Sequence, residues 1–295
     1  MPDQAEKLRR MVAEEAPNVP LSAPAPPMIA VTGGKGGVGT TTVAMNLAAA
    51  LADGGRRVVL VDAARHHADL TELAGIHVCG GGTLSDVLAG KTSAAEALAP
   101  GPAGTLLLAD RWGARPHSNF SSTAQQRLLA ELDALGHLAD VLVIDTGSGA
   151  SQWAQQFWQH ARLIIVIAAC DDVAVMDAYA TIKLGTVTAS DAEVRVLVNQ
   201  SRRDGDATEV GRRLALACRR FLGRTVPALP ALPLHAADEV GASEDSAPRV
   251  WEVPSTPFGH AVLWLGSAVR DLLAPCATAC SETNGGMSEA RTAAR

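Results

Sequence analysis

The sequence predicts a three-layer α/β fold in which helices cover both faces of a mostly parallel sheet. Short apolar runs rich in Val, Ile and Leu recur along the chain, and segments with helical periodicity separate them. Strands that are apolar on both faces are typical of parallel sheets enclosed by two helical layers. The chain has 295 residues, of which 47% are hydrophobic and only 3% aromatic, so aliphatic side chains must build this core.

Strands and helices are expected to alternate from Met28 onward. The first helix should end at Gly54 and Gly55, because glycine readily adopts the conformations that terminate helices. The expected strands are residues 28–33, 56–63, 104–110, 140–147, 162–169 and 193–199. The expected helices are residues 40–53, a segment between the fourth and fifth strands, a segment containing residues 176–184, and residues 207–221 and 258–274.

The α/β domain is expected over residues 28–275, with a separate segment before and after it. Residues 1–15 should contain a helix, because Asp3 and Glu6 have the spacing of a capping box. Residues 16–27 contain five prolines and predict an extended tether of roughly 35 Å. Residues 276–295 are small and polar, which predicts a disordered tail.

Charge and hydropathy narrow the expected location and partners. The net charge of -6 disfavours a general nucleic-acid-binding surface, so nucleic acid is not expected as a partner. The amino terminus opens with charged residues and has no apolar signal-peptide region, and the apolar run at 163–170 is too short to cross a bilayer. We therefore expect a cytoplasmic protein that is at most peripheral at the inner face of the plasma membrane.

The segment GGKGGVGTTT (33–42) lies between the first strand and the first helix, where a phosphate-binding loop is placed. Glycines let the backbone approach an anion, and the helix N-terminus adds N–H donors. Compared with the loop pattern G-x-x-x-x-G-K-[ST], Thr40 stands in the lysine position and Thr41 supplies the hydroxyl. Losing that lysine should weaken phosphate binding by roughly ten- to a hundredfold, while the main-chain cradle remains.

Three polar residues at strand ends complete the predicted site. Asp62 and Asp145 end two apolar strands, and carboxylates at that edge of a parallel sheet are suited to Mg²⁺. Asn199 ends a third strand. The pattern is consistent with two roles for it, recognition of a nucleotide base or formation of a turn. His66 and His67 follow the second strand and are interpreted as part of a solvated loop.

Residues 35–41 resemble K-G-G-x-G-K-[ST], the signature of the MinD/ParA class of P-loop ATPases. The resemblance implies a P-loop NTPase fold, ATP and Mg²⁺ as ligands, and Lys35 as the lysine that reaches a partner subunit's phosphates in a homodimer. It also implies that Asn199 recognises adenine. Members of the class often have a second aspartate two positions after Asp62, which orients the attacking water, and this chain has Ala64 there. The implied metal-binding residues are Thr41, Asp62 and Asp145, and the implied catalytic residues are Lys35 and Asp62. The implied nucleotide-binding residues are Gly34, Lys35, Gly36, Gly37, Val38, Gly39, Thr40, Thr41, Thr42 and Asn199.

Three segments are similar to the flagellar-number regulators called FlhG, FleN or YlxH: DQAEKLRRMV (3–12), DTGSGAS (145–151) and DAYATIK (177–183). In that family the amino-terminal helix engages the SRP-type GTPase FlhF and stimulates its GTP hydrolysis. The resemblance therefore implies an FlhF-type partner, and also flagellar basal-body or transcriptional regulators. The implied partner-binding residues are Asp3, Gln4, Ala5, Leu8 and Arg9.

The combined prediction is an FlhG-like scaffold that binds ATP weakly and hydrolyses it slowly or not at all, because Thr40 and Ala64 replace groups tied to turnover. The alternative is a working ATP-switched dimer of the same class, acting in cell-pole, septum or DNA positioning, with Lys35 substituting for the absent lysine. Arginines 212, 213, 219 and 220 are interpreted as a solvated helix face, although relatives of the ParA kind use such residues to bind DNA.

Overall fold

The computed structural model describes residues 23–64, 69–76, 82–110, 121–189, 191–203, 205–235 and 248–274. The predicted amino-terminal helix and the predicted carboxy-terminal tail lie outside these residues. The partner-binding residues Asp3, Gln4, Ala5, Leu8 and Arg9 therefore stay predictions, as do the assignments for His66 and His67. Of the predicted tether, residues 23–27 are described, and they form neither helix nor strand.

A seven-stranded sheet with the order β3-β4-β2-β5-β1-β6-β7 forms the middle layer. Every neighbouring pair of strands is parallel except β3 and β4. The strands are β1 (Met28–Gly33), β2 (Val58–Asp62), β3 (Ala99–Pro100), β4 (Leu106–Leu108), β5 (Val141–Ser148), β6 (Leu163–Ala168) and β7 (Glu193–Val198). The mostly parallel sheet confirms the predicted fold class.

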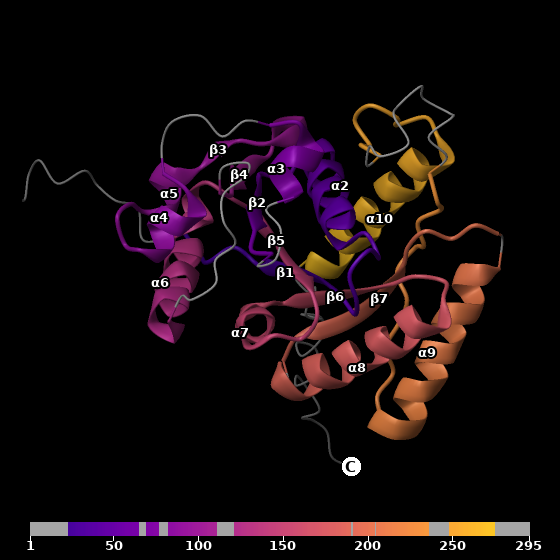
Figure 1. Cartoon of the computed structure of the whole chain (residues 1–295). Helices are drawn as coiled ribbons and strands as arrows, with labels where there is room; N and C mark the ends of the chain where they lie inside the picture. Colours follow the sequence, from indigo (N-terminus) through magenta and orange to yellow (C-terminus); the bar gives the residue numbers. More distant parts are fainter. Residues whose placement is uncertain are drawn as a thin grey trace, which may run out of the picture.

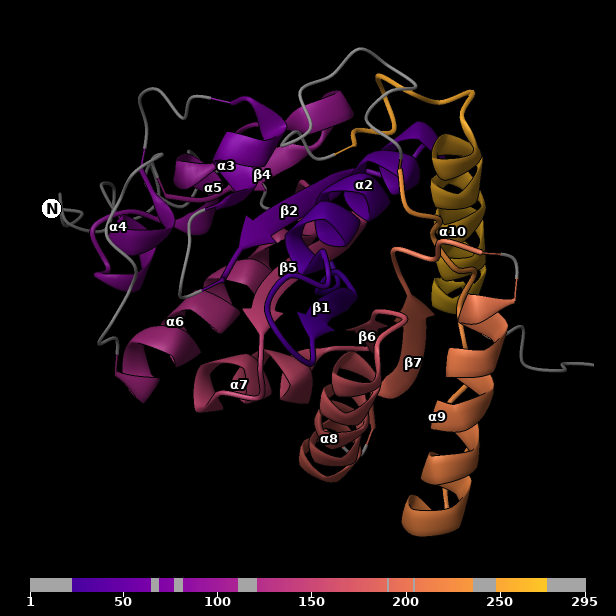
Figure 2. The same cartoon turned by 45° about the vertical axis from the view of Figure 1, so that its right-hand side comes forward.

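Helices cover both faces of this sheet (Figures 1 and 2). On one face, α2 and α10 pack together over β1, β2, β5 and β6. On the other face, α4 to α7 cover one half of the sheet and α8 and α9 cover the other. The helices are α2 (Thr40–Asp53), α3 (Asp69–Ala74), α4 (Leu84–Leu88), α5 (Ala94–Ala97), α6 (Ser122–Asp133), α7 (Gln152–His160), α8 (Asp172–Thr188), α9 (Asp206–Leu222) and α10 (Pro257–Leu273). None of the helices in the described ranges is long and apolar enough to cross a membrane.

Successive residues of β1 supply both cores, because side chains alternate across a strand. Ile29 and Val31 pack with α2 and α10, whereas Ala30 packs on the opposite face with Trp158 and Ala178. All of these side chains are buried. A strand enclosed in this way must be apolar at every position, which is the pattern that predicted the fold.

Between β2 and β5, the predicted strand at 104–110 is present as β4, whereas β3 and the helices α3 to α6 were not predicted. The helices α4 and α5 have only five and four residues, so they carry less than two turns of hydrophobic periodicity. Capping boxes define their starts, with Thr83 paired to Asp86 and Ser93 paired to Glu96. The signal that could have located them was therefore capping chemistry rather than periodicity.

Asn46 is a fully buried polar residue on α2 that anchors the chain entering α10. Its Nδ2 donates to Thr42 O and to Pro248 O, each at 2.8 Å, and its Oδ1 accepts from Val250 N at 2.6 Å. Two of these bonds link segments about two hundred positions apart in sequence. They fix the 248–250 segment against the helix that follows the glycine-rich loop.

We predict that Asn46→Ala lowers the free energy of unfolding by about 2–3 kcal/mol, because it leaves the part-buried Pro248 carbonyl and the buried Val250 N–H without a partner. Urea denaturation followed by circular dichroism measures the change. Gln152→Ala, which truncates an exposed amide at the start of α7, is the matched control and should change stability by less than about 0.5 kcal/mol. Equal stability of the two variants would contradict the assigned role of Asn46.

Candidate nucleotide-binding site

The loop from Gly34 to Gly39 joins β1 to α2 and is shaped by positive φ angles. Gly37 and Gly39 both have φ of 83°, a left-handed conformation that glycine adopts without steric strain. The helix α2 begins at Thr40 with no side-chain cap and no acidic residue in its first turn. Its first N–H groups are therefore left for an anion, as a phosphate cradle requires.

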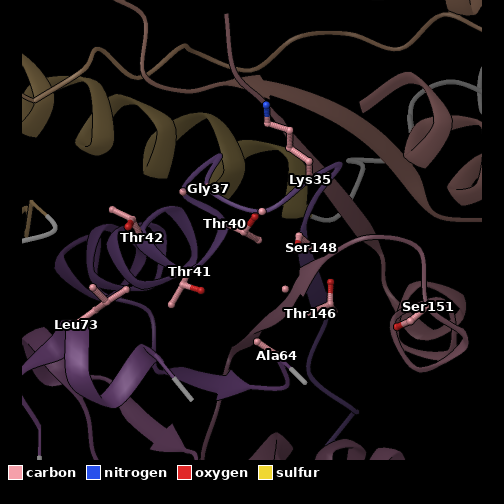
Figure 3. A pocket seen from close by; sticks show the side chains of 13 residues that line it. Lys35, Gly37, Thr40, Thr41, Thr42, Ala64, Leu73, Thr146, Ser148 and Ser151 are labelled. Atoms are coloured by element: carbon pink, nitrogen blue, oxygen red, sulfur yellow. The ribbon is translucent and has the colours of Figure 1, made fainter. Parts of the chain in front are cut away.

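A cavity of about 380 Å³ opens beside this loop. In Figure 3 the loop and the first turn of α2 form one wall, and Thr146, Ser148 and Ser151 stand on the other, with Ala64 nearby. The lining residues are Lys35, Gly36, Gly37, Gly39, Thr40, Thr41, Thr42, Ala64, Leu73, Thr146, Gly147, Ser148 and Ser151. The predicted residues Gly34, Val38, Asp62, Asp145 and Asn199 are not among them.

The two predicted metal-binding aspartates are brought side by side. Asp62 and Asp145 are register partners in the parallel pair β2 and β5, and both are buried. Burial raises the pKa of Asp62 well above its usual range, and the neighbouring charge of Asp145 raises it further, with a smaller contribution from Asp110. Two adjacent buried carboxylates are costly without a cation, which makes this position suitable for one.

The donor set fits Mg²⁺. Asp62 Oδ2 is buried and has no hydrogen-bond partner among the described residues, and Thr41 presents its hydroxyl at the cavity. Mg²⁺ prefers oxygen ligands and usually retains water and phosphate oxygens. The described part of the chain holds no group of three or more His, Cys, Asp or Glu that could bind a metal without help. Thr41, Asp62 and Asp145 would thus hold the ion together with a nucleotide, and the ion would neutralise phosphate charge.

Lys35 does not point into its own cavity. Its Nζ lies 3.2 Å from Asp171 Oδ1, and Figure 3 shows the side chain extending away from Thr41, Ala64 and Thr146. Asp171 is also the N-cap of α8, where it accepts a hydrogen bond from Ala174 N. The Lys35 side chain is 37% exposed, so the ion pair is open to solvent.

Comparison with known proteins identifies the family. Residues 27–188 match a family described as an AAA domain. The chain is 30% identical over 253 residues to the antiactivator FleN of Pseudomonas aeruginosa. The aligned region covers 79% of this chain and 90% of FleN. The chain belongs to the MinD/ParA class of P-loop ATPases.

One further relative and one solved structure resemble this MinD/ParA-class protein. The flagellum site-determining protein YlxH of Helicobacter pylori is 29% identical over 165 residues, or 54% of this chain and 53% of YlxH. The septum site-determining protein MinD of Pyrococcus horikoshii, solved with Mg-ADP, superposes with a TM-score of 0.65 at 22% identity, covering 83% of this chain and 96% of that chain. The structural match concerns the fold alone.

Two side-chain amides from the residues that follow β7 donate hydrogen bonds to carbonyl groups of the phosphate-binding loop. Asn199 Nδ2 donates to Val38 O at 2.9 Å, and Gln200 Nε2 donates to Gly37 O at 3.1 Å. Asn199 is buried, and Gln200 has a φ of 59°, unusual for a residue other than glycine. The predicted contact of Asn199 with adenine stays a prediction; what the structure adds is a contact of Asn199 with the loop.

Several cavity residues escaped the sequence reasoning. Thr146, Ser148 and Ser151 put hydroxyls opposite the loop, yet only Asp145 of the segment DTGSGAS was assigned a role. The clustering of hydroxyl residues directly after Asp145, at the carboxyl end of β5, is the signal that could have found them. No sequence signal indicated Leu73 or Gln200, because each reaches the site from a distant segment.

The raised pKa of Asp62 predicts a pH-dependent stability. The folded chain holds the Asp62 proton more tightly than the unfolded chain, in which the carboxyl titrates near 3.9. Ionisation of Asp62 therefore reduces folding stability as the pH rises above about 4. Asp62→Asn removes this penalty, so its free energy of unfolding should exceed that of the parent protein at pH 7. The difference should shrink as the pH falls toward 4.

Urea denaturation between pH 4 and pH 7 in the presence of EDTA measures this difference, since a bound cation would mask it. Asp53→Asn, at the exposed end of α2, is the control and should behave like the parent at every pH. The interpretation is wrong if Asp62→Asn is no more stable than the parent at pH 7.

Proposed function

We propose that this chain is an FlhG-like regulator of flagellar number or placement that binds ATP weakly and hydrolyses it slowly or not at all. In this proposal it acts in the cytoplasm as a scaffold. The observation that carries the proposal is a phosphate-binding loop with intact main-chain geometry whose cavity is lined by Thr40 and Ala64. The similarity to FleN and YlxH supports the flagellar role.

Thr40 accounts for the proposed weak binding. Its side chain lines the cavity at the position where a loop lysine would place an ammonium group against the β- and γ-phosphates. A charge-assisted hydrogen bond contributes roughly 1.5–3 kcal/mol, which corresponds to about ten- to a hundredfold in affinity. The main-chain donors of the loop do not depend on this side chain, so binding is reduced rather than abolished.

Ala64 accounts for the proposed slow hydrolysis. It lines the cavity close to Gly147, and its methyl group cannot accept a hydrogen bond from an attacking water. The same placement means that a carboxylate introduced at position 64 would project toward the cavity. The chain thus lacks both a partner for developing phosphate charge and a group that orients water.

Restoring these groups tests the degenerate site. Calorimetry with Mg-ATP should show that Thr40→Lys binds about ten- to a hundredfold more tightly than the parent. The double variant Thr40→Lys, Ala64→Asp should in addition release phosphate faster than the parent. Thr42→Lys is the matched control, because it adds the same charge two positions along the same helix turn and should gain less.

Parent protein that hydrolyses Mg-ATP as fast as intact MinD-class ATPases, measured side by side, would contradict the degenerate site. A double variant with unchanged phosphate release would mean that other parts of the site are also impaired.

The proposed partner is an FlhF-type GTPase, engaged by residues 1–15. Leu8 and Arg9 would supply apolar and charged contacts on one amphipathic segment, beside Asp3, Gln4 and Ala5. The test is GTP hydrolysis by the cognate FlhF with full-length protein and with protein lacking residues 1–15. Stimulation should disappear with the deletion, and a Leu8→Glu, Arg9→Glu variant should reproduce that loss; unchanged stimulation would reject the proposed role.

A working ATP-switched dimer is the second candidate, favoured by the position of Lys35. Although Lys35 is among the residues that line the cavity, its ammonium group forms an exposed ion pair, from which it could reach a partner subunit's phosphates. ATP-dependent dimer formation together with phosphate release, both lost in Lys35→Ala, would select this candidate over the weakly binding scaffold.

A further inference from the structure

Trp153 is a buried residue beside the nucleotide site that is not among the residues lining its cavity. It lies in the first turn of α7, and its indole Nε1 donates a hydrogen bond to Ala63 O at 2.8 Å. Ala63 directly follows β2, so this bond joins the end of a strand to a helix that begins far along the chain. In Figure 3, Ala64 lies at the cavity, and Ser151 marks the start of α7.

The surroundings of Trp153 fix the direction of its indole N–H. Phe157, one turn further along α7, makes an edge contact with the ring, with centroids 5.3 Å apart and planes at 77°. Gln125 on α6 is itself buried and donates from Nε2 to Trp153 O at 2.7 Å. The ring packs in the core that also contains Ala63. These contacts keep the indole N–H directed at the Ala63 carbonyl.

The bond from Trp153 sets the orientation of the peptide unit between Ala63 and Ala64. The Ala63 carbonyl and the Ala64 N–H belong to one planar trans peptide, in which they point in opposite directions. Fixing the carbonyl on one side therefore aims the N–H toward the other side. That N–H donates to Asp62 Oδ1 at 3.3 Å.

Asp62 is thereby held with one carboxylate oxygen engaged and the other left over. Oδ1 accepts the Ala64 N–H, whereas Oδ2 has no hydrogen-bond partner among the described residues. Hydrogen bonds from the backbone of Ala64 and Leu70 counteract the increase that burial causes in the pKa of this carboxyl, and Ala64 has the larger effect. A hydrogen bond that favours the charged form keeps the carboxylate suited to a cation.

We infer that Trp153 is a positioning residue for the Mg²⁺ site, an inference that rests on the proposed binding of nucleotide. The indole N–H fixes the 63–64 peptide, the peptide N–H orients the Asp62 carboxylate, and Asp62 Oδ2 is left for the ion. Removing a group that orients a metal ligand in this way lowers metal affinity about 10–100-fold in other proteins. The alternative is a packing role, in which Trp153 only fills the core and satisfies a buried carbonyl.

Calorimetry of the full chain with ATP, once with Mg²⁺ and once with EDTA, separates these two roles. The measured quantity is the dissociation constant with EDTA divided by that with Mg²⁺, which isolates the contribution of the ion. Trp153→Phe keeps an aromatic ring but lacks the N–H, so this ratio should fall about tenfold or more below the parent value. Circular dichroism shows whether each variant is folded.

Trp158→Phe is the matched control. Trp158 lies on the same helix and is fully buried, but its Nε1 has no hydrogen-bond partner among the described residues. The same exchange of indole for phenyl at this position should leave the ratio at the parent value. A packing role for both tryptophans predicts equal effects of the two variants.

Trp153→His adds a conservative test, because a neutral imidazole also carries an N–H donor. Histidine removes more apolar surface than phenylalanine does, so packing alone predicts that it is the more damaging change. A positioning role predicts the opposite order, with more of the Mg²⁺ dependence kept in Trp153→His than in Trp153→Phe.

A measurement on the parent does not need a folded Trp153 variant. In ¹⁵N-labelled protein with ATP bound, adding Mg²⁺ should shift a buried indole N–H resonance that is still present in Trp158→Phe. Absence of that shift, an unchanged ratio in Trp153→Phe, or a lower ratio in Trp153→His than in Trp153→Phe would each overturn the inference. A parent that binds no ATP even with Mg²⁺ is a different outcome, which rejects the proposed nucleotide binding and this inference with it.

Discussion

The parallel register of β1, β2 and β5 is the constraint on which the rest of this structure depends. It brings the glycine-rich loop that follows β1 to the same sheet edge as Asp62 and Asp145. The aspartates could not lie side by side if either strand slipped by one position, because alternate residues point to opposite faces. The two apolar cores maintain that register by enclosing the strands from both sides.

Within this frame, binding and chemistry depend on different parts of the chain. Phosphate recognition relies on backbone conformation, which Gly37 and Gly39 secure through positive φ. Hydrolysis relies on individual side chains, and the chain differs from the family pattern at Thr40 and Ala64. A P-loop protein can therefore lose groups tied to turnover without a change of fold, because neither side chain is needed to form the loop.

Sequence reasoning predicted the parts of the site that are local. The β1–α2 loop and the two aspartates near the carboxyl ends of β2 and β5 could be located because each is defined by residues next to one another in the chain. The ion pair of Lys35 with Asp171 and the amide contacts of Asn199 and Gln200 join segments more than a hundred positions apart. Such contacts depend on strand order, which local patterns in the sequence do not specify.

The hydrogen bonds from Asn199 and Gln200 have a mechanical consequence. β7 is an edge strand of the sheet, and the side chains of the two residues that follow it donate hydrogen bonds to the loop carbonyls of Val38 and Gly37. Displacing residues 199 and 200 would stretch both bonds, so the position of this sheet edge and that of the loop carbonyls depend on one another.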